Sequence, residues 1–137
     1  MIVTTQFKGL AVIERDLAMR EARLIEGTDR SLKVIADYGA DLIRTAMLSA
    51  GSPSAPGGAP GIVTGNLIKS VQSEHATGSL QAVIRVGTAG RKKGGAPHWH
   101  LLEFGTVKMA ARPVIRPSGK LASEHGQTLI NEVVRRA

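Results

Sequence analysis

The chain has 137 residues and a net charge of +7. It has no cysteine, which excludes disulfides, cysteine-based zinc sites and thiol catalysis. Its length allows one domain, so we expect a single domain over residues 1–137, made in a reducing cytoplasm. No apolar run approaches the roughly 20 residues of a membrane span, and the N-terminus lacks the pattern of an export signal. We therefore expect no membrane partner.

The excess of positive over negative charge is confined to the second half of the chain. Residues 1–63 contain 7 Lys+Arg and 7 Asp+Glu, and residues 64–137 contain 11 and 4, which together give the 18 and 11 of the whole chain. Such a field favours an acidic partner, either nucleic acid or an acidic protein surface. A charged surface that only keeps the protein soluble is the plainer interpretation.

Two amphipathic helices are predicted in the first fifty residues. Between residues 7 and 25 the apolar side chains recur at helical spacing: Leu10, Ile13, Leu17 and Leu24. Gly27 then suits a helix end, and Thr28 or Asp29 suits the N-cap of the next helix. The second predicted helix, residues 32–47, has one continuous apolar face, which favours packing against a sheet or a neighbouring subunit.

Glycine and proline divide the rest of the chain. Residues 51–63 and 88–97 are predicted to be flexible loops, and residues 64–70 a single helical turn with Thr64 available as its cap. Residues 71–76 and 80–86 are predicted to be the strands of a hairpin, because apolar and polar side chains alternate on both sides of a short Thr-Gly-Ser connection.

A third strand is predicted through residues 101–104, a fourth at residues 114–115, and a C-terminal helix from Ser118 to Ala137. The expected fold is therefore α+β: a mainly antiparallel sheet of about four strands packed against two N-terminal helices and one C-terminal helix.

The segment from His98 to Pro117 holds the densest chemistry. His98 and His100 would share one face of a strand, but Glu103 would fall on the other face and no third ligand has matching spacing, so we predict no metal site. No nucleophile motif or acidic pair stands out either. We expect a non-enzymatic protein with no cofactor.

Two Arg-Pro pairs follow in the same segment. Because each proline restricts the residue before it, Arg112 and Arg116 are predicted to be extended, in a stiff arm. Gly105 is expected to mark a tight turn or a backbone position with positive φ. A partly buried acid needs a partner, so Glu103 is expected to pair with Arg112 or Arg116.

Three motifs carry a resemblance. They are TGNLIKS at residues 64–70, LEFGT at residues 102–106 and KMAARP at residues 108–113. In this order and spacing the chain, from about residue 30 onward, resembles the neck or tail-completion proteins that join head to tail in long-tailed double-stranded DNA phages. LEFGT is the most specific of the three.

The resemblance implies a structural virion protein that forms a homo-oligomeric ring, expected to be a hexamer, at the head–tail junction. Its neighbours would be the head-closure or connector protein and the tail-tube or terminator protein, with non-specific contact to DNA in the channel. The interface residues it implies lie in and after LEFGT: Leu102, Glu103, Phe104, Gly105, Thr106, Met109, Arg112, Pro113, Arg116 and Pro117.

Two alternatives remain open at this stage. A tail-terminator ring that caps the tail tube would share this size and charge. A stand-alone basic DNA-binding module is the other, with Arg91, Lys92 and Lys93 as the contacts to DNA or to an acidic partner. The DNA-binding module predicts strongly salt-dependent DNA binding by the monomer.

Overall fold

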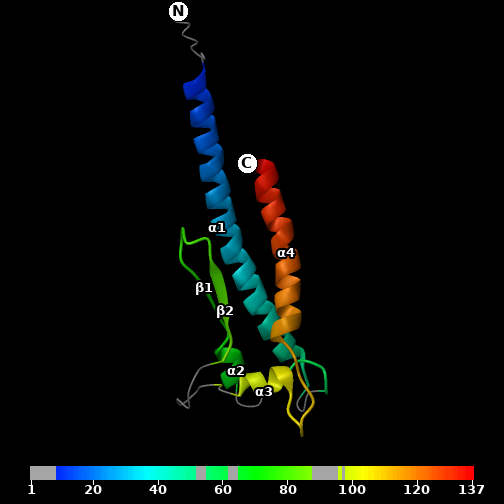
Figure 1. Ribbon diagram of the computed structural model, residues 1–137. Coiled ribbons are helices and arrows are strands. Elements are labelled where there is room, and N and C mark those ends of the chain that lie inside the picture. The colour runs from blue at the N-terminus through cyan, green and yellow to red at the C-terminus, as the bar shows by residue number, and fades with distance from the viewer. Residues whose placement is uncertain (1–8, 52–54, 62–64, 88–95, 97) are drawn as a thin grey trace, which may run out of the picture.

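The structure is a computed structural model that describes residues 9–51, 55–61, 65–87, 96 and 98–137. Two long helices, α1 (Leu10–Ser49) and α4 (Ile115–Arg136), lie side by side and run in opposite directions (Figure 1). The N-terminal part of α1 projects beyond the end of α4, and the molecule is therefore elongated.

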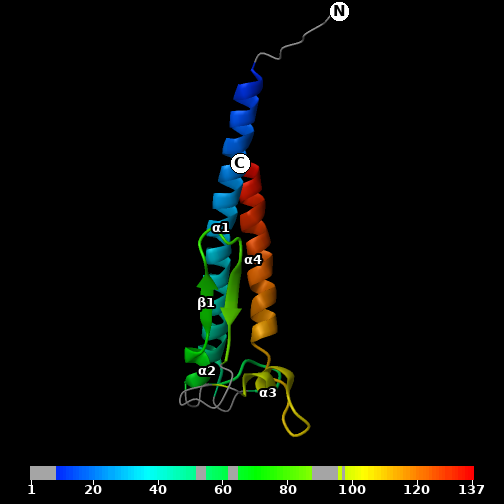
Figure 2. The ribbon, with the colours of Figure 1, turned by 60° about the vertical axis from the view of Figure 1, so that its left-hand side comes forward.

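Shorter elements surround the C-terminal part of α1. A hairpin of β1 (Gln72–His75) and β2 (Ala82–Arg85) lies along α1, on a different side from α4 (Figure 2). The helices α2 (Asn66–Lys69) and α3 (Trp99–Phe104) lie near the C-terminal end of α1. Thr64, the predicted cap of α2, is outside the described residues, and Gly65 occupies the N-cap position.

The predicted four-stranded sheet is wrong. In the described residues the strands form one two-stranded antiparallel sheet, in which Gln72 pairs with Arg85 and His75 with Ala82. The structure confirms this predicted hairpin, but the described residues form neither the third nor the fourth predicted strand. Residues 101–104 belong to α3, and Ile115 begins α4, because short apolar runs fit a helical turn as well as a strand.

The predicted break after the first helix is also wrong, because α1 continues through Gly27 without interruption. A Cβ added at Gly27 would lie 2.7 Å from Cγ1 of Val133 in α4. The missing side chain therefore gives α4 room to approach, and Gly27 marks a helix contact where the sequence suggested a helix end.

Small residues set the spacing between α1 and α4 along the whole contact. A Cβ at Gly39 would lie 2.5 Å from Cδ1 of Ile84 and 3.2 Å from Cβ of Ala122, and a Cβ at Gly126 would lie 2.8 Å from Cδ1 of Ile35. At Gly39 the hairpin and α4 thus meet on the same turn of α1. At these glycines, which have no side chain, the side chains of the neighbouring elements pack directly against the helix backbone.

The main apolar core lies at the C-terminal end of α1. Its buried members come from α1, from the segment before β1 and from the start of α4: Ala40, Ile43, Met47, Val71 and Val114. Partly buried side chains of α2 and β2 close it. The core therefore ties the start of α4 to the end of α1.

A single carboxylate attaches the hairpin turn to α1. Asp29 accepts hydrogen bonds from the backbone N–H groups of Gly78 (3.0 Å) and Leu80 (3.3 Å), and its Oδ1 lies 3.0 Å from Nε2 of His75. The Gly78 hydrogen bond is the main cause that lowers the pKa of Asp29 from its usual value of 3.8, and the contact with His75 adds to it. A second tie, from the Ser73 hydroxyl to Asp37, lowers the pKa of that carboxyl.

Alanine at two glycines of α4 is expected to have opposite effects. Gly119→Ala adds a methyl group in open space and raises helix propensity, so the free energy of unfolding should rise by about 0.5–1 kcal/mol. Gly126→Ala forces its methyl against Ile35, and such overpacking costs about 1–3 kcal/mol. Urea unfolding of both variants measures the difference, and equal stabilities would contradict the close contact at Gly126.

Acid should loosen the hairpin through Asp29. Because the folded-state pKa of Asp29 is below its usual value of 3.8, its contribution to stability is present above that pH and is lost as the pH falls through the folded pKa. The stability advantage of the wild type over Asp29→Asn should therefore shrink between about pH 5 and pH 2. Urea unfolding across this range tests it, with Asp16→Asn, an exposed site, as the control. An advantage that stays constant would contradict the assignment.

Candidate docking surface at the start of helix α4

The Glu103 carboxylate caps the N-terminus of α4. Its Oε2 accepts hydrogen bonds from the backbone N–H groups of Val114 (2.8 Å) and Ile115 (3.0 Å), and its Oε1 accepts one from Arg116 (2.8 Å). Glu103 is buried, and it lies in α3, a separate element. A negative charge at the positive end of a helix dipole is favourable, and here it also fixes α3 against α4.

Proline completes the cap. The first N–H groups of a helix have no partner within the helix, yet Pro117 has no N–H to satisfy. The N–H of Ser118 is bonded to the carbonyl oxygen of Val114 (3.2 Å), which is the first bond of the helix. All backbone donors at this end of α4 are thus accounted for. The predicted extended conformation of Arg116 is therefore wrong, because the second Arg-Pro pair forms the first turn of α4.

Residues 105–114, called the arm below, connect α3 to α4. Gly105 has φ of +75°, as predicted, and a Cβ there would lie 2.7 Å from the backbone nitrogen of Ala111. Thr106 and Met109 exchange backbone hydrogen bonds of 2.8 and 3.2 Å, so the arm turns back on itself at Val107 and Lys108. The returning segment is held to α3 by the Arg112 N–H, which donates to the carbonyl oxygen of Leu102 at 2.7 Å.

Neither predicted ion pair with Glu103 appears among the described residues, because the backbone donors occupy its carboxylate. The Arg116 guanidinium lies over the ring of Phe104 instead, 4.5 Å from its centroid. Arg112 is half-buried, and its Nε has no hydrogen-bond partner in the described part of the chain. Each arginine therefore keeps a positive charge that the Glu103 carboxylate does not pair.

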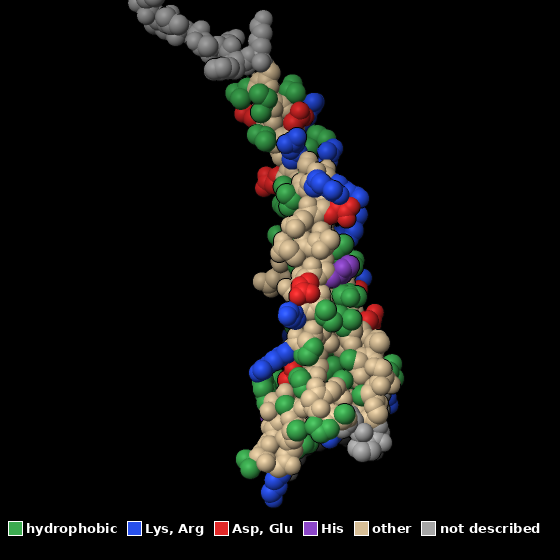
Figure 3. Space-filling model, turned by 90° about the vertical axis from the view of Figure 1, so that its right-hand side faces the viewer, with side chains coloured by type: hydrophobic (Ala, Val, Ile, Leu, Met, Phe, Trp, Pro, Cys, Tyr) green, Lys and Arg blue, Asp and Glu red, His purple; other side chains and the backbone are tan. Residues whose placement is uncertain are grey.

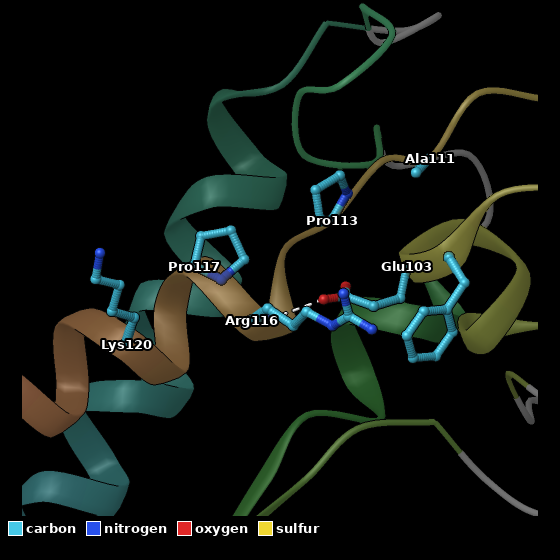
Figure 4. A pocket seen from close by; sticks show the side chains of 7 residues that line it. Glu103, Ala111, Pro113, Arg116, Pro117 and Lys120 are labelled. Atoms are coloured by element: carbon cyan, nitrogen blue, oxygen red, sulfur yellow. Dashed lines mark hydrogen bonds between the residues drawn. The ribbon is translucent and has the colours of Figure 1, made fainter.

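A hollow of about 400 Å³ opens beside Glu103 between α3, the arm and α4 (Figure 4). Its apolar wall is formed by Phe104, Ala111, Pro113 and Pro117, and its cations are Arg116 and Lys120. Phe104 is 58% exposed, and Val107 at the tip of the arm is fully exposed. We call the exposed side chains of Phe104, Val107, Arg116, Pro117 and Lys120 the arm surface.

The residues singled out from the sequence fall into two groups. Those in and after LEFGT come together around Glu103, with Leu102, Thr106 and Arg112 holding the arm through their backbone and Pro113 and Pro117 lining the hollow. The basic residues Arg91, Lys92 and Lys93 lie outside the described residues.

Sequence reasoning missed how Glu103 acts. It was expected to meet a guanidinium, whereas it meets three consecutive backbone N–H groups. Pro117 was a signal, because proline is favoured in the first turn of a helix and an acid is favoured near that turn. Eleven positions separate Glu103 from Val114, so only the fold could identify the acid.

His98 and His100 do not form the two-histidine face considered above. His98 is the N-cap of α3 and His100 lies within that helix, next to Trp99. Within the described ranges, no group of three or more metal-ligating side chains is placed to hold an ion. Likewise, no helix in those ranges combines the length and apolar character needed to cross a membrane.

Comparisons of the chain with protein-family models, with curated proteins and with solved structures each gave no match.

Removing one acceptor oxygen from the cap should be costly. Glu103→Gln keeps the size of the side chain, but its amide NH₂ group would face at least one backbone N–H at the start of α4. Leaving a buried donor without an acceptor costs about 1–3 kcal/mol, so the free energy of unfolding should fall by that amount.

Urea unfolding monitored by circular dichroism measures this loss. Glu124→Gln, on an exposed position of the same helix, is the matched control and should change stability by no more than about 0.5 kcal/mol. Equal effects of the two substitutions would show that the charge and second oxygen of Glu103 do not hold the cap.

Proposed function

We propose that the chain is a structural component of the head–tail junction of a long-tailed phage, where copies of it form a ring and dock on neighbouring neck and tail proteins. The observation that carries the proposal is the arm surface. Two of the three motifs behind the resemblance, LEFGT and KMAARP, form one constrained unit with the start of α4, built around Glu103. The function rests on association, with no catalytic step.

The construction of the arm supports a docking role. The Glu103 cap, the Gly105 turn and the Arg112 hydrogen bond fix its backbone before any partner arrives. The side chains that this framework presents include an exposed aromatic ring and an exposed valine, Phe104 and Val107. A preorganised surface loses little conformational entropy on binding, which favours affinity without a large contact area.

The charge of the arm surface favours an acidic partner. Arg116 and Lys120 border an apolar hollow whose one carboxylate, Glu103, is buried and hydrogen-bonded to backbone. A partner segment with an apolar side chain for the hollow and a carboxylate for the two cations would complement it. In this proposal, the acidic protein surface considered from the net charge would bind there.

Arg116→Ala should separate assembly from folding. The substitution keeps the backbone N–H that Glu103 binds but removes the exposed guanidinium over Phe104. We expect the free energy of unfolding to change by less than about 1 kcal/mol, while ring formation and particle completion are lost. Native mass spectrometry across concentration and salt, and electron microscopy of particles assembled with the variant, measure the two outcomes.

Arg85→Ala is the matched control, because Arg85 is an exposed arginine of the hairpin, paired with Glu74 at 2.8 Å. It should leave assembly unchanged. Rings and complete particles from Arg116→Ala would remove the arm surface from the mechanism. A monomer that binds duplex DNA tightly at low salt and releases it steeply as salt rises would favour the DNA-binding alternative instead.

A further inference from the structure

The N-terminal part of α1 is an amphipathic helix with nothing packed on it in the described structure. Residues 10–25, called the overhang below, precede Gly27, where Val133 in the last turn of α4 meets α1. Figure 3 views the molecule from the α4 side and shows hydrophobic side chains exposed on this projecting end. The exposed fractions of Leu10, Ile13 and Leu17 are 52, 58 and 60%.

The exposed stripe is the continuation of an interface that already exists. Gly27, Ile35 and Gly39 are in contact with α4 or within reach of it. The overhang residues Leu10, Ile13, Leu17 and Leu24 follow one another at intervals of three, four and seven residues, and Leu24 precedes Gly27 by three residues and Ile35 by eleven. Such steps return to the same side of a helix with 3.6 residues per turn, so the α4-facing side of α1 runs on uncovered to its N-terminus.

An uncovered overhang of this length is poorly stabilised by itself. From Leu10 to Arg23 the helix extends about 20 Å at 1.5 Å per residue, and every residue of this stretch is exposed. Isolated helices of about 12–15 residues are marginal in water, and most helical stability in proteins comes from packing an apolar face. The apolar stripe therefore requires an apolar partner.

The charge of the overhang indicates which partner. It contains three acidic residues and three basic ones: Glu14, Asp16, Glu21, Arg15, Arg20 and Arg23. The overhang is thus neutral in a chain of net charge +7, which argues against DNA or an anionic membrane, since either would select a cationic face. A neutral helix with an apolar stripe fits another neutral helix, and a second copy of this chain supplies one.

The position of α4 fixes how two copies can meet. If two overhangs ran parallel with their stripes facing, each α1 would continue into the space that the α4 of the other copy occupies. If they run antiparallel, the overhang of one copy takes the place next to the other α1 where α4 ends, and its first residues meet the last turn of that α4 near Leu24. Leu17 then lies at the two-fold axis, with Leu10 opposite Leu24 of the second copy.

We propose that the overhang is a self-association site, which packs antiparallel against the overhang of a second copy of this chain, centred on Leu17. This contact is isologous, because the same patch serves both copies. It does not depend on the arm surface or on the proposed role at the head–tail junction.

Sedimentation equilibrium of the purified full chain over a range of concentrations tests the proposal. The wild type should be in reversible monomer–dimer equilibrium. Leu17→Arg places two like charges at the two-fold axis and should weaken the dimer by about a hundredfold. Met19→Arg is the matched control, since Met19 is an exposed apolar residue on the other side of the same overhang, and it should leave the dimer intact.

Cysteine cross-linking reports the orientation, because the chain has no cysteine of its own. Leu17→Cys should form a disulfide-linked dimer on mild oxidation, and Leu10→Cys should form one only when mixed with Leu24→Cys. A wild type that stays monomeric at all concentrations, a dimer unaffected by Leu17→Arg, or Leu10→Cys chains that cross-link with each other would each overturn the proposal. Rings that persist in Leu17→Arg would leave the proposed function standing without it.

Discussion

The capping of α4 by the Glu103 carboxylate is the interaction on which the candidate docking surface depends. One buried side chain from α3 satisfies three consecutive backbone donors at the start of another helix, and Pro117 removes the fourth. Because the cap is supplied from outside the helix, it does two tasks at once. It starts α4 at Ile115, and it closes the arm into a loop between two fixed points, Glu103 and Val114. The cap therefore fixes the positions of the exposed side chains on that loop.

Helix contacts through small residues give the rest of the molecule its shape. Gly27, Gly39 and Gly126 bring backbone close to the side chains of Val133, Ile84 and Ile35, and the hairpin is added by Asp29 at one end and by the core near Met47 at the other. These features extend the rigid part of the protein from the arm to the level of Gly27. Further along α1, every residue from Leu10 to Arg23 is exposed.

The sequence predicted those parts of the fold that local patterns determine, and it failed where distant residues decide. The hairpin, the C-terminal helix and the positive φ of Gly105 follow from alternation, helical spacing and the special freedom of glycine, and the structure contains all three. Gly27 was interpreted as a helix end because its partner Val133 lies more than a hundred residues away. The run through Leu101 and Leu102 is too short to separate a strand from a helical turn, and this error produced the wrong sheet. At the candidate site the residues chosen from the sequence lie together around Glu103, but the hydrogen bonds of Glu103 were not predicted, since an acid can be recognised locally and a backbone donor cannot.

The two proposed contact sites lie at opposite ends of α1, whose 40 residues span about 60 Å. An antiparallel pair formed through the overhangs would carry its two arm surfaces at its two far ends, pointing away from each other. Both surfaces could not then enter one ring, because a ring needs neighbouring copies in the same orientation. Ring formation would therefore require the pair to separate, and the overhang contact must be weak enough to allow it. Three exposed apolar side chains per copy and the partly buried Leu24, on a neutral helix, suit such a reversible contact, which would keep the stripe covered until the copies meet the neighbouring neck and tail proteins.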